Sequence, residues 1–493
     1  MKTNQMINRR GFLKKGTQVT FGAMLASYAP AFLRAESVPP NVVFIICDQM
    51  RGDAMSGLDS PNAHTPNLDK MAASGTLFEN YFTNNPVCAP SRVTLFSGLY
   101  PHQHGKLTNP TGRFIESFEG SMLGYFRNRG YRLGWIGKNH TYTKEVLRSL
   151  DTWEDRAREP FRKYSKFVPP YWHSDTLWPE EKCHPRMNTE DAIKFINAAK
   201  KNEPFFLHIS YFDPHPPYMA PSEYTSKYCS KDMVLPPFVH PKKLSDRLDE
   251  QCRALHYDRI KDSDLTETMR YYFASIEWGV DYQVGRILRT LEEKGLSDNT
   301  IVVFTSDHAD FMGEHRMVRK GMFLYDALLH IPMIWYAPGR IGKGIRVKNL
   351  TQHVDMFPTL LDLTGGKAKN ELPGRSLKPF LQGKSKKEED FTIFASAAYS
   401  DLPPNYFNNP EPPYKHDSDV PFHTRIENLT WKDDHRTVMA RTREFKLILN
   451  ESRSPELYHM DDKWIEKENI ADKKEFASQR KSLEAKIKSV WKW

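Results

Sequence analysis

The sequence predicts an α/β protein, a mostly parallel sheet sandwiched by helices, followed by a smaller α+β region at the C-terminus. Three observations lead to this fold class. Short apolar runs end directly in polar or charged residues, helical patterns lie between these runs, and a hairpin pattern with a terminal helix closes the chain. Strands that alternate with helices are typical of parallel sheets that carry helices on both faces.

The predicted strands of the main sheet are continuous apolar runs, as expected for strands that are buried on both faces. The run 41–47 ends at Asp48, and similar runs follow at 131–136, 205–211, 300–305 and 331–336. Parallel sheets of this type place their functional residues at the carboxyl ends of strands. The residues that come directly after each run are therefore the first candidates for a site.

The clearest helix lies between the later strands of this sheet. Apolar residues recur at helical spacing from Met269 to Leu291, and Gly295 marks the end of the pattern.

The pattern changes near the C-terminus. Residues 436–440 and 445–449 flank a short polar connection and predict a hairpin, 456–459 predicts another strand, and 475–490 an amphipathic helix. We therefore expect a main domain at 36–384 and an α+β subdomain with an antiparallel sheet at 385–493.

The N-terminal residues carry most of the net charge of +9. Residues 1–35 hold six Lys and Arg and no acid, so the remainder is only mildly basic at +3, and we expect no nucleic-acid partner. Residues 8–14 resemble a twin-arginine export signal, and the apolar stretch 19–32 behind them is too short for a stable membrane span. We expect residues 1–35 to be a signal peptide and the protein to be periplasmic or extracellular.

The cysteine count is odd, which singles out one thiol in an exported protein. The five cysteines are Cys47, Cys88, Cys183, Cys229 and Cys252. With Cys88 reactive and Cys47 in a buried strand, the other three allow at most one disulfide, and no C-x-x-C zinc pattern is present.

The run from Cys88 to Gly98 carries the strongest functional signal. It places a potential nucleophile four residues before Arg92, and one helical turn brings the two positions to the same side. An arginine there can hold an oxyanion bidentately beside the nucleophile. The alternative is a buried structural cysteine that happens to precede the Pro90 turn.

This run, Cys-x-Pro-Ser-Arg closed by Ser-Gly, resembles the signature of type I sulfatases. The resemblance implies an alkaline-phosphatase-like core and a maturation enzyme that oxidises Cys88 to formylglycine, whose hydrated aldehyde is the nucleophile. It covers residues 41–338, and the segment around 456–458 more weakly.

Polar residues after two of the strands predict a metal site. Asp48 and Gln49 follow one apolar run, and Asp307 and His308 follow another. Such a mixed oxygen and nitrogen set suits Ca²⁺, Mg²⁺ or Mn²⁺ better than zinc. In the family these positions usually hold Asp-Asp and Asp-Asn, and residue 88 is also a ligand. The resemblance favours calcium, although the imidazole shifts the preference towards the softer manganese.

Further charged residues match the family's sulfate-binding and proton-transfer elements. By resemblance, Lys138 contacts the nucleophile and sulfate, His140 orients or deprotonates the hydrated aldehyde, His215 protonates the leaving group, and Lys320 binds sulfate. Both histidines follow separate predicted strands, and an imidazole exchanges protons near neutrality. Arg319 is the alternative to Lys320, and we take His102, His104, His330 and His353 as surface or core residues.

The resemblance implies hydrolysis of sulfate esters, on a sulfated polysaccharide or oligosaccharide. Two alternatives stay open: a phosphodiesterase or phosphonate monoester hydrolase on the same scaffold, favoured by Gln49 and His308, and a non-catalytic polyanion-binding protein in which Cys88 stays a thiol. Aromatic and basic residues at 169–178 and 405–425 either line a sugar-binding cleft or pack in loops.

Overall fold

The computed structural model describes residues 39–491 except 110–112, 156–172, 177, 201, 238, 241–242, 245–247, 250–259, 385–391, 398–435 and 461–464. The predicted signal peptide, Cys252, the stretch 405–425 and half of 169–178 (residues 169–172 and 177) lie outside these residues. Among the described helices, none has the length and apolar character needed to cross a membrane.

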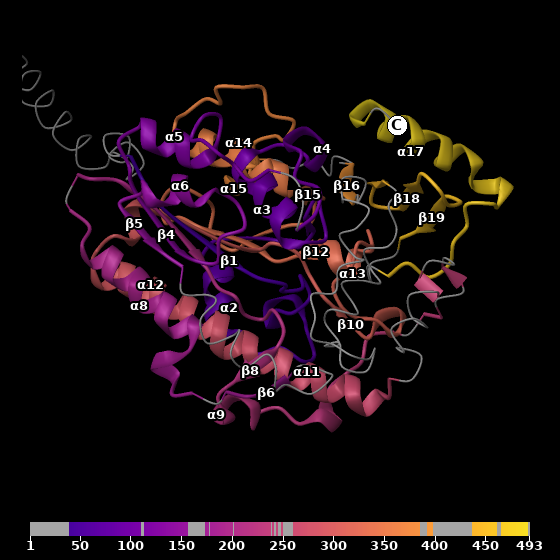
Figure 1. The fold of residues 1–493 in the computed structure, drawn as a ribbon, viewed down its shortest axis with the longest axis horizontal. Helices are drawn as coiled ribbons and strands as arrows, with labels where there is room; N and C mark the ends of the chain where they lie inside the picture. Colours follow the sequence, from indigo (N-terminus) through magenta and orange to yellow (C-terminus); the bar gives the residue numbers. More distant parts are fainter. Residues whose placement is uncertain are drawn as a thin grey trace, which may run out of the picture. The chain divides into compact units, whose positions relative to one another are not determined.

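The predicted α/β sheet is confirmed as an eight-stranded sheet at the centre of residues 40–493 (Figure 1). Its order is β14 (Ile345–Val347), β2 (Thr76–Phe78), β13 (Met333–Tyr336), β9 (Thr300–Ser306), β1 (Asn41–Cys47), β7 (Phe205–Ser210), β4 (Arg132–Gly137) and β5 (Thr152–Glu154). The five strands from β9 to β5 are parallel. The run 331–336 departs from this, because β13 pairs antiparallel with both β9 and β2.

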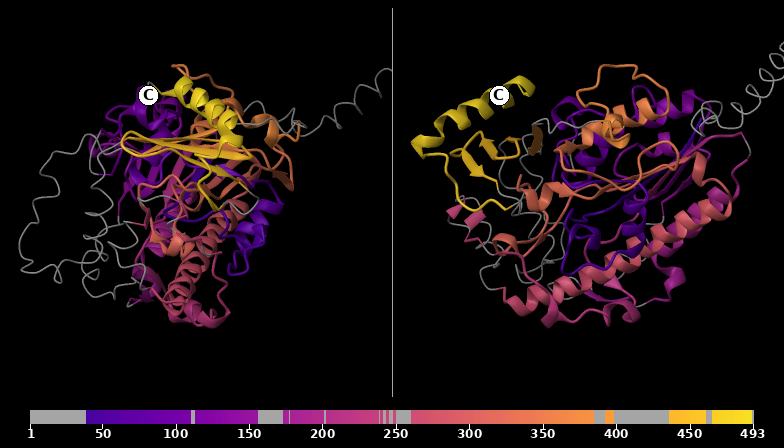
Figure 2. Two further views of the ribbon diagram at one scale, coloured as in Figure 1. Left: turned by 90° about the vertical axis from the view of Figure 1, so that its right-hand side faces the viewer. Right: turned by 180° about the vertical axis from the view of Figure 1, so that it is seen from behind.

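Helices cover both faces of the sheet, and alternate residues of β1 face the two layers. Val42, Phe44 and Ile46 pack in one apolar core with α3 (Cys88–Ser97), α5 (Met122–Asn128) and α14 (Met356–Leu363). Val43, Ile45 and Cys47 pack in the other with α2 (Pro66–Ala73), α8 (His184–Asn197), α11 (Asp262–Ile276) and α12 (Tyr282–Glu293). Figure 2 shows the long α11–α12 segment running along one face of the sheet. This double burial is why the strand sequences are apolar without alternation.

The helix predicted at 269–291 is real but is not a uniform α-helix. Residues Glu277–Asp281 form a π-helical turn between α11 and α12, a feature that is frequent near functional sites. Gly279 of this turn lies against Asp213, so close that an added Cβ would fall 2.8 Å from the Asp213 Cβ. The turn therefore lets the helix pass tightly behind the loop that follows β7.

Shorter elements complete the main part of the chain. The strands are β3 (Tyr81–Phe82), β6 (His173–Asp175), β8 (Tyr218–Ala220), β10 (Phe311–Met312), β11 (Val318–Arg319), β12 (His330–Ile331) and β15 (Thr351–Gln352). The helices are α4 (Pro101–His104), α6 (Lys144–Arg148), α9 (Ser222–Thr225), α13 (Asp326–Leu329) and α15 (Lys378–Leu381).

The predicted C-terminal hairpin and helix are confirmed. An antiparallel sheet has the order β16 (Ile393–Ala397), β17 (Thr437–Arg441), β18 (Phe445–Asn450) and β19 (Glu456–His459). The helix α17 (Ala477–Val490) packs Leu483 and Ile487 on one face of this sheet. On the other face, Met439 and Tyr458 share a core with α13. The proposed division at residue 385 falls among residues that are not described and stays a prediction.

Candidate active site and metal centre

The predicted site residues follow neighbouring strands at the carboxyl edge of the sheet. β1 lies between β9 and β7, and Cys47 is in register with Ser306, so Asp48 and Asp307 emerge side by side. Lys138 follows β4, which is the next strand beyond β7. Gly137 makes this last turn with a φ of 90°, and an added Cβ would lie 2.1 Å from the Ser210 carbonyl oxygen. The Gly-Lys sequence thus brings Lys138 tightly over the end of β7.

Cys88 is the first residue of the ten-residue helix α3 and is 1% exposed. Its Sγ lies 3.0 Å from Lys320 Nζ, 3.2 Å from His308 Nε2 and 3.6 Å from Asp48 Oδ1. The helix N-terminus also favours negative charge at this position. The alternative of a cysteine in an apolar interior does not fit these neighbours.

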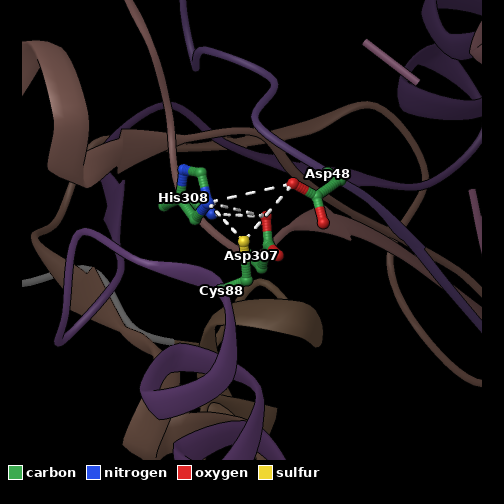
Figure 3. A group of neighbouring side chains, drawn as sticks. All are labelled: Asp48, Cys88, Asp307 and His308. Atoms are coloured by element: carbon green, nitrogen blue, oxygen red, sulfur yellow. Dashed lines mark hydrogen bonds and ion pairs between the residues drawn. The ribbon is translucent and has the colours of Figure 1, made fainter. Parts of the chain in front are cut away.

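Four side chains converge into a cluster suited to a divalent cation. The ligating atoms of Asp48, Cys88, Asp307 and His308 all lie within 4.8 Å of one another and are buried (Figure 3). A hydrogen bond sets the tautomer of His308. Its Nδ1 donates to the Ala309 carbonyl oxygen at 2.9 Å, which leaves Nε2 facing the cluster. An imidazole fixed in this way is the usual arrangement of a metal-binding histidine.

In each of the two carboxylates, one oxygen bonds to positively charged side chains and the other faces the cluster. Asp48 Oδ2 accepts from Arg92 Nη2 at 3.0 Å and from Lys138 Nζ at 2.5 Å, while its Oδ1 faces His308. Asp307 Oδ2 accepts from Arg92 Nε at 2.7 Å, while its Oδ1 lies 3.8 Å from His308 Nε2. The second oxygen of each carboxylate thus faces the cluster, where Asp307 Oδ1 also accepts from the backbone N–H groups of Gln49 and His308 at 3.1 and 2.9 Å.

Arg92 is fully buried, and each of its three nitrogens donates to the protein. Nη1 bonds Ser210 Oγ at 2.7 Å, and the other two nitrogens bond the carboxylates of Asp48 and Asp307. The sequence led us to expect this arginine to grip an oxyanion substrate. These contacts hold two carboxylates of the cluster in place, and the grip on an oxyanion stays a prediction.

Charges around the cluster shift the pKa values of its members in opposite directions. Burial and Asp48 oppose ionisation of the Cys88 thiol, but Lys138, Lys320 and His308 outweigh them and lower its pKa well below the usual value. Burial likewise opposes ionisation of Asp48, yet Lys138 and His215 hold its pKa well below the ordinary range. Burial and the charge of Asp48 raise the pKa of Asp307. Two buried carboxylates with opposite shifts indicate a place where extra positive charge is favourable.

Gln49 follows Asp48 in a left-handed conformation with φ of 73° and is 1% exposed. Its backbone N–H donates to Asp307 Oδ1 at 3.1 Å, and its Nε2 donates to Asp310 Oδ2 at 2.8 Å. Its Oε1 is buried and has no hydrogen-bond partner among the described residues. A buried amide oxygen without a partner next to two carboxylates fits a further metal ligand.

The two predicted proton-transfer histidines lie on the loops that follow β7 and β4. His215 is half-buried, and its Nδ1 donates to the Pro216 carbonyl oxygen at 2.7 Å. Burial and Lys320 lower its pKa well below the ordinary value, so it is neutral in the free protein at neutral pH. His140 is half-buried on the loop after β4, two residues beyond Lys138.

Several contributors to the site carry no signal of their own in the sequence. Ser210, the last residue of β7, orients Arg92, and Asp310 binds the Gln49 amide. His353, taken from the sequence as a surface or core residue, lies within hydrogen-bonding distance of Ser91 Oγ and the Ser306 carbonyl oxygen. Cys47, Cys183 and Cys229 are free thiols.

Comparison with known proteins relates the chain to enzymes. The family model described as "Sulfatase" matches residues 40–366. The chain is 29% identical over 392 residues to an arylsulfatase of Clostridium perfringens, covering 71% of this chain and 80% of that protein. It is 25% identical over 514 residues to an N-acetylglucosamine-6-O-sulfatase of Bacteroides thetaiotaomicron, covering 91% and 86%.

Solved structures share the fold. The chain aligns with the phosphonate monoester hydrolase of Agrobacterium radiobacter with a TM-score of 0.73 at 24% identity, over 92% of this chain and 95% of that one. At this identity the likeness concerns the fold alone.

Proposed function

The chain belongs to the sulfatase family and hydrolyses sulfate esters, and we propose that it does so on a sulfated carbohydrate, with a formylglycine derived from Cys88 and one divalent metal ion. The observation that carries this proposal is the setting of Cys88. Residue 88 lies at a helix N-terminus, within 3.6 Å of a lysine, an imidazole and a carboxylate, and is one of the four members of the buried cluster that could hold a metal ion.

The metal proposal assigns Asp48, Gln49, residue 88, Asp307 and His308 as protein ligands. The bound cation would neutralise charge on the sulfate group during transfer. Oxygen donors from two carboxylates and an amide support calcium, whereas the imidazole supports manganese, with magnesium as the third candidate.

The reaction proposal gives each charged residue a distinct task. A hydrated aldehyde at residue 88 would supply two hydroxyls. One would lose its proton to solvent and bond to sulfur as the ester S–O bond breaks. Deprotonation of the second would re-form the aldehyde and break the C–O bond to sulfate, and water would then restore the hydrate. Lys138 and Lys320 offset the charge of the bound sulfate, and Arg92 keeps both carboxylates oriented. His215 gives a proton to the alcohol oxygen as its bond to sulfur breaks, and His140 takes the proton of the second hydroxyl.

His215 must gain a proton before it can give one. In the free protein Lys320 and Lys138 help to keep it neutral. A bound sulfate ester brings negative charge between these lysines and so raises the pKa of His215. We therefore propose that substrate binding itself charges the proton donor.

The carbohydrate substrate is supported by the relative named N-acetylglucosamine-6-O-sulfatase. The twin-arginine-like residues 8–14 support export to the periplasm or beyond. Because that route carries folded proteins, a formylglycine-generating enzyme would act on Cys88 in the cytoplasm before export.

Free sulfate release from a panel of sulfated mono- and oligosaccharides tests the proposal. We expect release from at least one carbohydrate ester, and none from the same protein with Cys88→Ala. A faster reaction with aryl phosphodiesters or phosphonate monoesters than with any sulfate ester would favour the alternative of a phosphodiesterase or phosphonate monoester hydrolase. Gln49 and His308 are the residues that favour this alternative. Saturable binding of sulfated glycan without hydrolysis would favour the polyanion-binding alternative.

A further inference from the structure

The side chain of Gln49 is held by a residue that the sequence did not single out. Its Nε2 donates to Asp310 Oδ2 at 2.8 Å, and both residues are at most 1% exposed. Asp310 lies 261 positions along the chain, three residues after Asp307. The contact therefore joins the two segments that supply the metal cluster.

Asp310 is itself held on two sides. The hydroxyl of Tyr218, on β8, donates to the same Oδ2 at 2.6 Å. Arg51 Nη1 donates to the backbone carbonyl of Asp310 at 2.8 Å. Asp310 is fully buried, with its carboxylate held by Tyr218 and its backbone held by Arg51, and is therefore a rigid partner for the amide of Gln49.

The backbone of Gln49 is also fixed. Its N–H donates to Asp307 Oδ1 at 3.1 Å, and its carbonyl oxygen accepts from the hydroxyl of Tyr272 at 3.2 Å. The left-handed φ of 73° is rarely adopted by a residue with a side chain. With the backbone and the amide nitrogen of Gln49 both held, its Oε1 is the polar atom that has no hydrogen-bond partner in the part of the chain that the structure describes.

An amide has a donor end and an acceptor end, and a carboxylate can only accept. Asp310 Oδ2 accepts from both the Tyr218 hydroxyl and Gln49 Nε2, so it takes the donor end of the amide and disfavours the flipped orientation. We propose that Asp310, supported by Tyr218, is a positioning residue that keeps the Oε1 of Gln49 available to the divalent cation. The inference depends on the proposed metal site and adds to it two residues that act through a ligand.

A double-mutant cycle on metal affinity tests this role. Ca²⁺ and Mn²⁺ binding to the full chain is measured by calorimetry for the wild type, Gln49→Ala, Asp310→Ala and the double variant. Loss of an outer partner of a metal ligand costs about 10- to 100-fold in affinity. We expect each single variant to lose affinity in this range and the double variant to bind within about threefold of Gln49→Ala, since Asp310 has nothing left to orient.

Three further variants sharpen the result. Asp310→Asn can present either an acceptor or a donor, so we expect an intermediate loss, and Tyr218→Phe a smaller one. Asp355→Ala is the matched control, because it removes a buried carboxylate that bonds the backbone of Gln352 and Arg375. We expect it to leave the metal dissociation constant within twofold.

Thermal unfolding in chelator confirms that each variant is folded. An unchanged metal affinity in folded Asp310→Ala, additive losses in the double variant, or no metal binding by the wild type would each overturn the proposal. Sulfate release is not part of the readout. If the losses in metal affinity are non-additive but the protein cleaves no sulfate ester, the positioning role of Asp310 is supported and the proposed function is contradicted.

Discussion

Arg92 Nε donates to Asp307 Oδ2 at 2.7 Å, and both side chains are fully buried. The same guanidinium reaches Asp48 Oδ2 at 3.0 Å. One arginine of α3 therefore fixes carboxylates from the ends of two strands, β1 and β9. The run Cys-x-Pro-Ser-Arg thus links residue 88 to the carboxylates of the cluster through a single turn of helix.

We expect Arg92→Lys to lose activity by about 10²-fold or more, because a lysine cannot reproduce the guanidinium fork on two carboxylates. Metal affinity should fall with it. The matched control is Arg441→Lys, since Arg441 is equally buried and its Nε bonds Asp326 Oδ2 at the same 2.7 Å. We expect the control to lose stability but to keep its kcat. A kcat that falls equally in both variants would show that Arg92 acts through stability alone.

Lys320 should control the ionisation of the unmodified Cys88 thiol. Its Nζ lies 3.0 Å from Cys88 Sγ, and its charge helps to lower the thiol pKa against burial and Asp48. In metal-free, unmodified protein we expect Lys320→Met to raise the pKa of Cys88, measured by thiolate absorbance with Cys88→Ala as the blank. An unchanged titration would show that the lysine does not act on this position.

Removing the metal should destabilise the protein, more strongly at neutral than at acidic pH. Cation at 100 times its dissociation constant stabilises the folded state by about 2.7 kcal/mol. Because burial and Asp48 raise the pKa of Asp307, protons compete with the metal at low pH and are released as it binds. The thermal shift produced by Ca²⁺ should therefore grow with pH and then level off once Asp307 is ionised. A shift that is equal at all pH values would contradict this competition.

His353 should make stability depend on pH. Burial lowers its pKa to about 3, and its folded neutral form contacts Ser91 and Ser306. Its contribution is fully present above the unfolded value of 6.5 and is lost as the pH falls towards 3, because only the unfolded chain takes up the proton there.

Between pH 7 and pH 5, we expect the stability difference between wild type and His353→Gln to shrink by about 2 kcal/mol in urea unfolding. The same substitution at the exposed His459 gives the baseline. A difference that stays constant with pH would show that His353 is not a buried neutral histidine.

The parts of the fold that depend on local pattern could be predicted from the sequence. The run 41–47 becomes β1 with Asp48 directly after it, and the C-terminal hairpin and helix lie where their patterns place them. The antiparallel direction of β13 could not be predicted, because an apolar run buried on both faces reads the same in either direction. The π-helical turn could not be predicted either, because one extra residue in a turn leaves the helical periodicity of apolar residues almost unchanged.

The site residues also fall into those that a local pattern predicts and those that it does not. Asp48, Cys88, Asp307 and His308 were found from strand ends and a motif, and the structure brings them together. The bond between Arg92 and Asp307 and the bond between Gln49 and Asp310 join residues more than two hundred positions apart. Such contacts are set by tertiary packing, which a single sequence does not display.

The state of residue 88 tests the central claim most directly. The peptide that contains it should be examined by mass spectrometry in protein produced together with a formylglycine-generating enzyme, alongside sulfate release by the same sample. We predict a mass in which an aldehyde replaces the CH₂–SH group, and a sulfatase rate proportional to the converted fraction. Full activity in a sample whose residue 88 is entirely thiol would contradict the account.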